Sequence, residues 1–366
     1  MQTRMKRLAL AGVTFAGALL LAEGAARALK LGPDVCQITT RWFRLSALPG
    51  VPYEFRPGVP YGRDFINTDC MRDRPRAVEK TPGTFRVACI GDSICSGLSV
   101  AATQCFSRVW EELARVAGGN EEILNFGVPG YNLEHILAAL RARTLKYRPD
   151  RVVYIFCLND LQDESYELEA LMDHLSPVQR YHWKHARRMG ASWLSHSRLF
   201  NLVRYGMLGR KASGFTRAPS RPEDDPQFFA ILRGNGAAYF DALYDDAGRT
   251  RLRQELLAFA ELARQQGFDP VLLIFPVPER SGGTRVDPLL DWVAVTGRSC
   301  GLRIVDARRA FRNTGVESLF ADPLHPNAAG HRLMAEILHA ELDPPSGAHD
   351  GSRPVTAAGA KTEPGR

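Results

Sequence analysis

The stretch FRVACIGDSICSG, residues 85–97, decides the fold class. It begins with a short apolar run without alternation, which is typical of a strand buried on both faces of a sheet. Gly91, Asp92 and Ser93 follow that run, and the next segment has apolar residues at helical spacing, namely Phe106, Val109, Trp110, Leu113 and Ala117. The stretch therefore predicts a strand, a tight turn and a helix, which is the repeating unit of a parallel α/β sheet.

The same alternation continues along the chain. Apolar runs recur at residues 122–126, 151–158, 269–275 and 302–306. Helical patterns follow them, with the later ones near residues 250–266, 286–299 and 327–342. We therefore expect an α/β protein whose parallel sheet of about five strands is covered by helices on both faces. Ligands of such sheets bind at the carboxyl ends of the strands.

Composition excludes several classes of protein. The 366 residues are 45% hydrophobic and 24% charged, which excludes a disordered, collagen-like or disulfide-scaffold chain and allows one large or two modest domains. The seven cysteines are dispersed without a C-x-x-C pair, so neither a zinc knuckle nor a disulfide framework is indicated. The formal net charge of +7 permits an anionic partner.

The N-terminus carries an export pattern. Arg4, Lys6 and Arg7 precede an apolar run over residues 8–22, which predicts a signal whose N-terminus stays in the cytoplasm. Three interpretations stay open: an uncleaved signal anchor, a signal peptide cleaved at Ala26-Arg27-Ala28, and a buried N-terminal helix of a soluble protein. The first places a membrane-anchored catalytic domain in the cell envelope, outside the cytoplasm, and the second gives a secreted protein.

The pattern divides the chain into four parts. Residues 1–30 are the signal segment, residues 31–84 are an irregular N-terminal arm rich in Pro, Gly and aromatic residues, and residues 85–342 form the α/β domain. An insertion at 161–250 interrupts that domain. Residues 343–366, rich in Pro, Gly and Ala, are expected to be a disordered tail.

The basic residues gather in the insertion. Between His174 and Pro222 there are ten Lys and Arg residues and no Asp or Glu, and interleaved apolar residues predict one or two amphipathic helices. A packed insertion with a solvated face, a lid or membrane-surface contact, and a nucleic-acid patch are the alternatives. Because the net positive charge is concentrated in this insertion and in the export signal, we expect a membrane or an anionic glycan as the contact and no nucleic-acid partner.

Three residues suggest nucleophilic catalysis. Ser93 stands at a strand-to-helix turn, where its hydroxyl is exposed at the functional edge of the sheet. Asp322 and His325 lie three residues apart before the last predicted helix, and they can supply the imidazole base and the carboxylate that a hydroxyl nucleophile needs. Taken singly, each has an ordinary alternative, since Ser and Asp cap helices and His325 can be an exposed loop residue.

Two further strand ends can stabilise an oxyanion. A glycine after the second strand, Gly127 or Gly130, lets a backbone N–H approach a substrate oxygen. Asn159 follows the third strand and offers a side-chain amide. The structural alternatives are a tight turn at either glycine, and a turn or cap at Asn159 and Asp160.

These pieces together resemble a known family. Gly91-Asp92-Ser93, Gly130, Asn159 and Asp322-x-x-His325 are similar, in order, to the four sequence blocks of the SGNH/GDSL hydrolase superfamily across roughly residues 85–342. The resemblance implies a flavodoxin-like three-layer α/β/α sandwich, here with a helical basic insertion. It also implies the activity of an esterase, lipase, thioesterase, carbohydrate deacetylase or acyltransferase.

The resemblance assigns a role to each residue. It implies that Ser93 is the nucleophile and the first oxyanion-hole donor, that Gly130 and Asn159 are the other two donors, that His325 is the base and that Asp322 orients it. Two departures from the family pattern are Cys157, where Gly is usual, and Ile94, where Leu is usual. The N-terminal apolar segment and the arm sequence NTDCMR, residues 67–72, resemble a bacterial subgroup that is exported and tethered to the membrane.

We therefore expect a serine esterase or deacylase that hydrolyses a carboxylic ester, carried by a small molecule, a glycan or a lipid, through an acyl-enzyme. An O-acyltransferase acting on a glycan with the same triad is one alternative. A non-catalytic, membrane-tethered glycan-binding protein is another. This chemistry requires neither a metal ion nor an organic cofactor.

Other reactive side chains are expected to be structural. Cys95, two residues past Ser93, is predicted to be a buried thiol. His135, His331 and His339 lie on predicted helices without an H-E-x-x-H spacing, so they are expected to be ordinary helix residues.

Overall fold

The computed structural model describes residues 2–31, residues 41–162 apart from Ala47 and Arg63, residues 197–200, 202–203 and 207, and residues 236–342. Cys36, most of the basic segment between residues 174 and 222, and the predicted tail at 343–366 lie outside the described residues.

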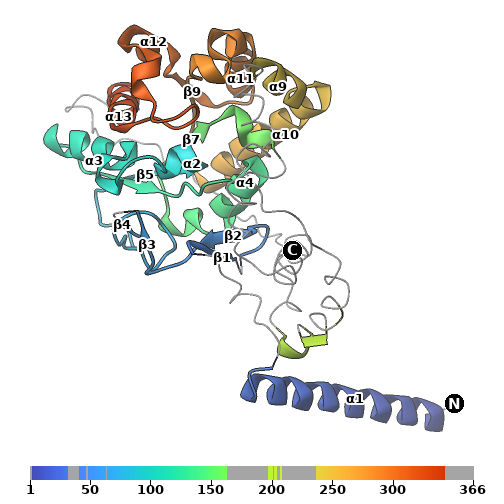
Figure 1. Ribbon diagram of the computed structural model, residues 1–366. Coiled ribbons are helices and arrows are strands. Elements are labelled where there is room, and N and C mark those ends of the chain that lie inside the picture. Colours follow the sequence, from blue (N-terminus) through green and yellow to red (C-terminus); the bar gives the residue numbers. More distant parts are fainter. Residues whose placement is uncertain are drawn as a thin grey trace, which may run out of the picture.

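A five-stranded parallel sheet lies at the centre (Figure 1). Its strands are β5 (Phe85–Gly91), β6 (Glu121–Asn125), β7 (Arg151–Phe156), β8 (Asp269–Ile274) and β9 (Arg303–Asp306). They are ordered β6-β5-β7-β8-β9, which is the flavodoxin-like order. The predicted α/β fold class is confirmed.

Helices cover both faces of the sheet (Figure 1). One face packs against α3 (Phe106–Val116), α12 (Arg308–Thr314) and α13 (Ala328–Leu342). The other packs against α4 (Leu133–Ala142), α10 (Asp246–Gln266) and α11 (Asp287–Ser299). Alternate strand residues point into the two layers, so Val87 and Cys89 belong to one core and Ala88 and Ile90 to the other.

Short elements fill the connections. They are α2 (Ser93–Ser96), α9 (Gly236–Leu243) and 3-10 turns at Ala102–Gln104, Thr144–Tyr147, Leu158–Leu161, Glu279–Ser281, Gly283–Val286 and Val316–Leu319. The turn after β7 and the helix after β5 matter most for function. Both begin at the carboxyl edge of neighbouring strands, where the strand order reverses and ligands bind in sheets of this type.

The arm contains regular structure that the sequence pattern does not reveal. It forms two antiparallel strand pairs, β1 (Phe43–Leu45) with β2 (Tyr53–Phe55) and β3 (Pro60–Tyr61) with β4 (Asp64–Phe65). Strands of two or three residues are too short to show alternation. The arm packs on the α/β domain, since the Tyr53 hydroxyl donates to the Pro129 carbonyl oxygen at 2.7 Å.

Helix α1 (Gln2–Ala28) stands apart from the rest (Figure 1). It is long and apolar enough to cross a membrane, and Leu20 and Leu21 are 74% and 77% exposed. A buried N-terminal helix does not fit this exposure, whereas a signal anchor and a signal peptide both do. Near its end, Glu23 accepts hydrogen bonds from the backbone N–H groups of Arg198 and Leu199 at 2.9 and 2.8 Å.

Candidate active site

The turn after β5 holds Ser93 at the edge of the sheet. Asp92 caps α2 by accepting a hydrogen bond from the Ile94 N–H at 2.9 Å, and Ser93 is the first residue of that helix. The helix ends at once because Gly97 adopts a left-handed conformation, with φ of 71°, which glycine favours. The capping alternative of the sequence therefore applies to Asp92, and the Ser93 side chain stays available for other contacts.

Ser93 faces the loop that precedes α13. His325 Nε2 lies 3.0 Å from Ser93 Oγ, and His325 Nδ1 lies 2.9 Å from Asp322 Oδ2. A carboxylate only accepts hydrogen bonds, so Nδ1 carries a proton, and Nε2 faces the serine hydroxyl. The structure thus brings Ser93 into contact with His325, 232 positions later in the sequence, and His325 into contact with Asp322. In this arrangement His325 can accept a proton from Ser93.

Asp322 is held in place by its own loop. Its Oδ1 accepts the backbone N–H groups of Leu324 and His325, both at 2.8 Å. Burial alone would raise the pKa of Asp322, but the hydrogen bonds from the His325 side chain and from these two N–H groups lower it below the usual value. Asp322 therefore remains a carboxylate at neutral pH and can stabilise a protonated His325.

Asn159 lies in the turn after β7, beside the same serine. Its Nδ2 donates to Asp92 Oδ2 at 3.1 Å, so Asp92 links the nucleophile turn to the Asn159 turn. An amide nitrogen has two donors, and this contact uses one of them. Cys157, which replaces the usual glycine, is buried, and its thiol lies 3.5 Å from Asp92 Oδ1.

Gly130 lies in the loop that follows β6. This loop runs along the end of β5, because the Val128 N–H donates to the Gly91 carbonyl oxygen at 3.1 Å. Gly130 has φ of 76°, a left-handed conformation. Gly127 has a different task, since a Cβ at that position would lie 2.3 Å from the Ser96 nitrogen. Gly127 therefore permits close packing of the loop on α2, and Gly130 lies further along the same sheet edge.

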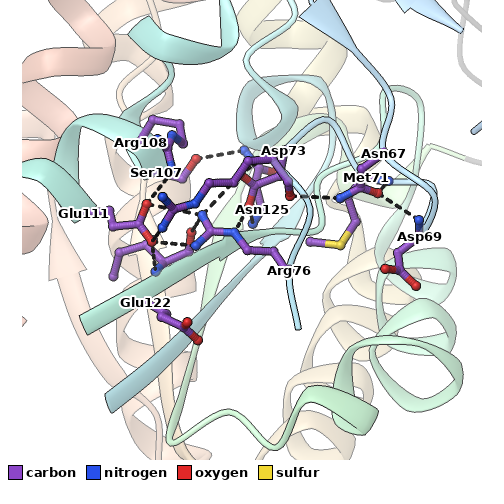
Figure 2. Close-up of polar contacts among 12 residues, drawn as sticks. Asn67, Asp69, Met71, Asp73, Arg76, Ser107, Arg108, Glu111, Glu122 and Asn125 are labelled. Carbon is purple, nitrogen blue, oxygen red and sulfur yellow. Dashed lines mark hydrogen bonds and ion pairs between the residues drawn. The ribbon is translucent and has the colours of Figure 1, made fainter. Parts of the chain in front are cut away.

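Sequence reasoning missed the role of Asn125, at the end of β6. Its Nδ2 donates to the Cys95 carbonyl oxygen at 2.7 Å, and its Oδ1 accepts the Gly127 N–H at 2.9 Å. Asn125 thereby ties the glycine loop to α2. Figure 2 shows Asn125 beside Asp73 of the arm and Ser107 of α3. The signal in the sequence was a polar residue, Asn125, at the end of a predicted apolar strand.

Asp160 and Asp92 are two buried carboxyl groups that lie close together. Asp160 accepts the Cys157 N–H at 3.0 Å and the Tyr154 hydroxyl. Burial and the neighbouring Asp92 raise the pKa of Asp160 well above its usual value. Ligand atoms of Asp92, Cys157 and Asp160 lie within 4.8 Å of one another, but the raised pKa disfavours the charged carboxylate that a cation needs.

Two other side chains are structural. The prediction for Cys95 is confirmed, because this thiol is fully buried and burial raises its pKa well above the usual value. His331 is also fully buried, and its Nδ1 accepts the Phe106 N–H at 3.4 Å. Burial lowers the pKa of His331 to about 3, so it is a neutral core residue.

Comparison with known proteins identifies the family. The chain matches the GDSL-like Lipase/Acylhydrolase family over residues 89–333, which is well over half of its length. No curated protein matches it.

Solved structures with a similar backbone path include three proteins. They are the acetyl xylan esterase AlAXEase (14% identity, TM-score 0.40, covering 70% of this chain and 100% of that one), a lipase/acylhydrolase from Enterococcus faecalis (16%, 0.40, 70% and 94%) and TesA (17%, 0.41, 71% and 98%). These low scores carry no argument about substrate. The family match over the domain that holds Ser93 and His325 shows that the chain is an ester hydrolase and belongs to the GDSL-like lipase/acylhydrolase family.

Proposed function

We propose that the protein hydrolyses a carboxylic ester of a small molecule, a glycan or a lipid through a covalent seryl ester. The observation that carries this proposal is the continuous contact from Ser93 Oγ to His325 Nε2 at 3.0 Å and from His325 Nδ1 to Asp322 at 2.9 Å. His325 accepts the hydroxyl proton as Ser93 Oγ attacks the ester carbonyl carbon, and Asp322 stabilises the resulting imidazolium.

The negative charge then develops on the carbonyl oxygen. The N–H groups of Ser93 and Gly130 and the second donor of the Asn159 amide stabilise it. Collapse of this intermediate breaks the ester bond, and His325 gives its proton to the departing alcohol. Water, deprotonated by His325, attacks the seryl ester, and the acid is released with Ser93 restored.

Labelling with a fluorophosphonate tests the proposal directly. We expect the probe to modify Ser93 in the wild-type chain and to leave Ser93→Ala unlabelled. An ester panel should then show hydrolysis by the wild type alone, with p-nitrophenyl acetate and butyrate, acetylated sugars, a lysophospholipid and an acyl thioester as substrates. Hydrolysis that survives Ser93→Ala contradicts the mechanism, and an acylated sugar product would identify an acyltransferase instead.

Asn159→Ala tests the oxyanion hole separately. We expect kcat for p-nitrophenyl acetate to fall by about 10²- to 10³-fold, the usual cost of losing one donor to the transition-state oxyanion. Fluorophosphonate labelling of Ser93 should persist, because His325 and Asp322 are untouched. A higher KM with an unchanged kcat would show that Asn159 binds the substrate without a specific contribution to the transition state.

We propose that α1 anchors the protein, with the catalytic domain outside the cytoplasm. Support comes from the exposed apolar side chains of α1 and from the basic residues at its start, which favour the cytoplasmic side. Full-length protein should sediment with membranes, and external protease should digest the domain in spheroplasts. A mature N-terminus following Ala28 would establish signal cleavage instead.

A further inference from the structure

The arm and the loop after α2 enclose a pocket of about 410 Å³. Its arm side includes Trp42, Tyr61 and Arg72, and its domain side includes Leu98, Ser99 and Gln104. The volume lies in the range of small-ligand sites. Residues 42–72 precede the family match, which begins at residue 89, so one wall of this pocket is an addition to the hydrolase domain.

The pocket is fixed relative to the proposed catalytic residues. The Leu98 N–H donates to the Ser93 carbonyl oxygen at 3.1 Å. The Ser99 hydroxyl donates to the carbonyl oxygen of Pro326, the residue after His325. The domain wall of the pocket therefore touches both turns that carry the proposed triad, while Ser93 and His325 do not line it.

Arg72 holds the two walls together. Its buried guanidinium donates to the Ser96 carbonyl oxygen at 2.9 Å and to the carbonyl oxygens of Gly97 and Val100. It also pairs with Asp64 Oδ2 at 2.7 Å. With both terminal nitrogens engaged in this way, Arg72 makes a preformed wall, and a preformed site loses less entropy when it binds a ligand.

The lining combines ring surfaces with polar groups. Trp42 and Tyr61 meet edge to face with ring centroids 5.4 Å apart. Tyr61 is buried, with the Arg72 guanidinium 5.1 Å from its ring centroid, and the Arg41 guanidinium lies 5.0 Å from the Trp42 ring centroid. The exposed ring surface therefore comes from Trp42, which is partly exposed.

Gln104 adds an exposed amide, and the Ser99 hydroxyl, whose proton goes to the Pro326 carbonyl oxygen, adds acceptor lone pairs. No Asp or Glu lines the pocket among the described residues. Aromatic surface next to hydroxyl and amide groups suits the C–H face and the hydroxyls of a sugar ring, whereas an acyl chain favours a lining without polar groups.

We propose that this pocket binds a sugar ring of an ester-bearing glycan, at a distance from the reacting ester. This inference rests on the proposed function, because it deepens the substrate class of the same site. The arm then selects oligosaccharide substrates, while a small ester such as p-nitrophenyl acetate reaches Ser93 without using the pocket.

Kinetics on two kinds of substrate test the inference in the full-length protein. The probes are three series of O-acetylated oligosaccharides with one to four rings, built from xylose, from β-1,4-linked glucose and from β-1,4-linked N-acetylglucosamine. They are compared with p-nitrophenyl acetate. For at least one series, wild-type kcat/KM should rise with ring number. Trp42→Ala should raise KM for that tetrasaccharide about tenfold, the effect typical of removing an aromatic anchor, and should change p-nitrophenyl acetate hydrolysis by less than about twofold.

Three variants keep the result interpretable. Trp42→Phe retains a ring and should restore most of the tetrasaccharide KM. Gln104→Ala, at an exposed position, should raise the same KM without affecting folding. Trp292→Ala removes a tryptophan of α11 that does not line the pocket, and it should leave the preference for longer chains intact.

Two results overturn the inference. One is that kcat/KM does not rise with ring number in any series, so that no acetylated oligosaccharide is a better substrate than its monosaccharide. The other is a Trp42→Ala effect that is equal for the tetrasaccharide and p-nitrophenyl acetate. In both cases hydrolysis of p-nitrophenyl acetate that depends on Ser93 leaves the proposed function standing, whereas activity independent of Ser93 removes the proposed function itself.

Discussion

Replacing His325 by alanine is expected to lower kcat for ester hydrolysis by about 10⁴- to 10⁶-fold, with little change in KM. The reason is the 3.0 Å contact between His325 Nε2 and Ser93 Oγ. A serine hydroxyl is a weak nucleophile at neutral pH, and removal of its base leaves catalysis only from the oxyanion hole and from substrate binding. Single-turnover kinetics with p-nitrophenyl acetate measure this effect.

Asp322→Asn is the companion variant and isolates the charge. The asparagine Oδ1 can still accept the N–H groups of Leu324 and His325, which Asp322 Oδ1 accepts at 2.8 Å, so the loop should keep its shape. The imidazolium loses its carboxylate, however, and the amide can stabilise the wrong tautomer of His325. We expect kcat to fall by about 10⁴-fold.

His339→Ala provides the matched control, since it removes a histidine from α13 at a site remote from the loop. Its activity should stay within about twofold of the wild type, because it takes no part in the proposed proton transfer. Retention of a tenth of the activity in His325→Ala, with an unchanged melting temperature, would show that another group deprotonates the nucleophile.

Parallel strands made the fold predictable. A strand such as β7 is buried at every residue, so after Arg151 it appears in the sequence as an unbroken apolar run without the alternating polar positions of an amphipathic helix. Helix α12 was missed because its seven residues, RRAFRNT, contain three arginines and too few turns to show a period. The strands of the arm were missed for the same reason of length.

Strand ends made the site partly predictable. The carboxyl ends of parallel strands meet at one edge, which explains why Asn159 contacts Asp92, the neighbour of Ser93, although 67 positions separate Asp92 and Asn159 in the sequence. The link between them could not be predicted, because it depends on the orientation of the Asp92 carboxylate toward Asn159 Nδ2. The contacts of the arm with the domain depend on how an irregular segment packs. Such a segment has no hydrophobic periodicity from which its contacts could be predicted.

Arg76→Met is expected to reduce the free energy of unfolding by about 3–5 kcal/mol, the cost of removing one partner from a buried ion pair. Arg76 joins the arm to the domain (Figure 2). Its Nε lies 2.8 Å from Asp73 Oδ2 and its Nη1 lies 2.6 Å from Glu111 Oε1, while the Arg76 and Asp73 side chains are only 3% and 1% exposed. Methionine fills similar space but leaves both carboxylates without this cation.

Arg74→Met is the matched control, because Arg74 pairs with the same Glu111 oxygen at 3.0 Å but is 52% exposed. Exposed ion pairs contribute about 0–1 kcal/mol. Urea unfolding of the two full-length variants in the same detergent measures the difference. Equal losses would show that burial does not control the strength of this cluster.

The pH dependence of the stability lost in Arg76→Met tests whether the charge of Arg76 is the cause. Burial raises the pKa of Asp73, and the charge of Arg76 opposes that rise. Without Arg76 the pKa of folded Asp73 should rise further above that of the unfolded chain, so the folded state binds a proton more tightly. Destabilisation should therefore be largest near neutral pH, where Asp73 must be buried as a carboxylate without its guanidinium partner, and should diminish as the pH falls and the carboxyl becomes protonated. A loss that is constant over this range would instead indicate that Arg76 contributes through packing of its side chain and not through its charge.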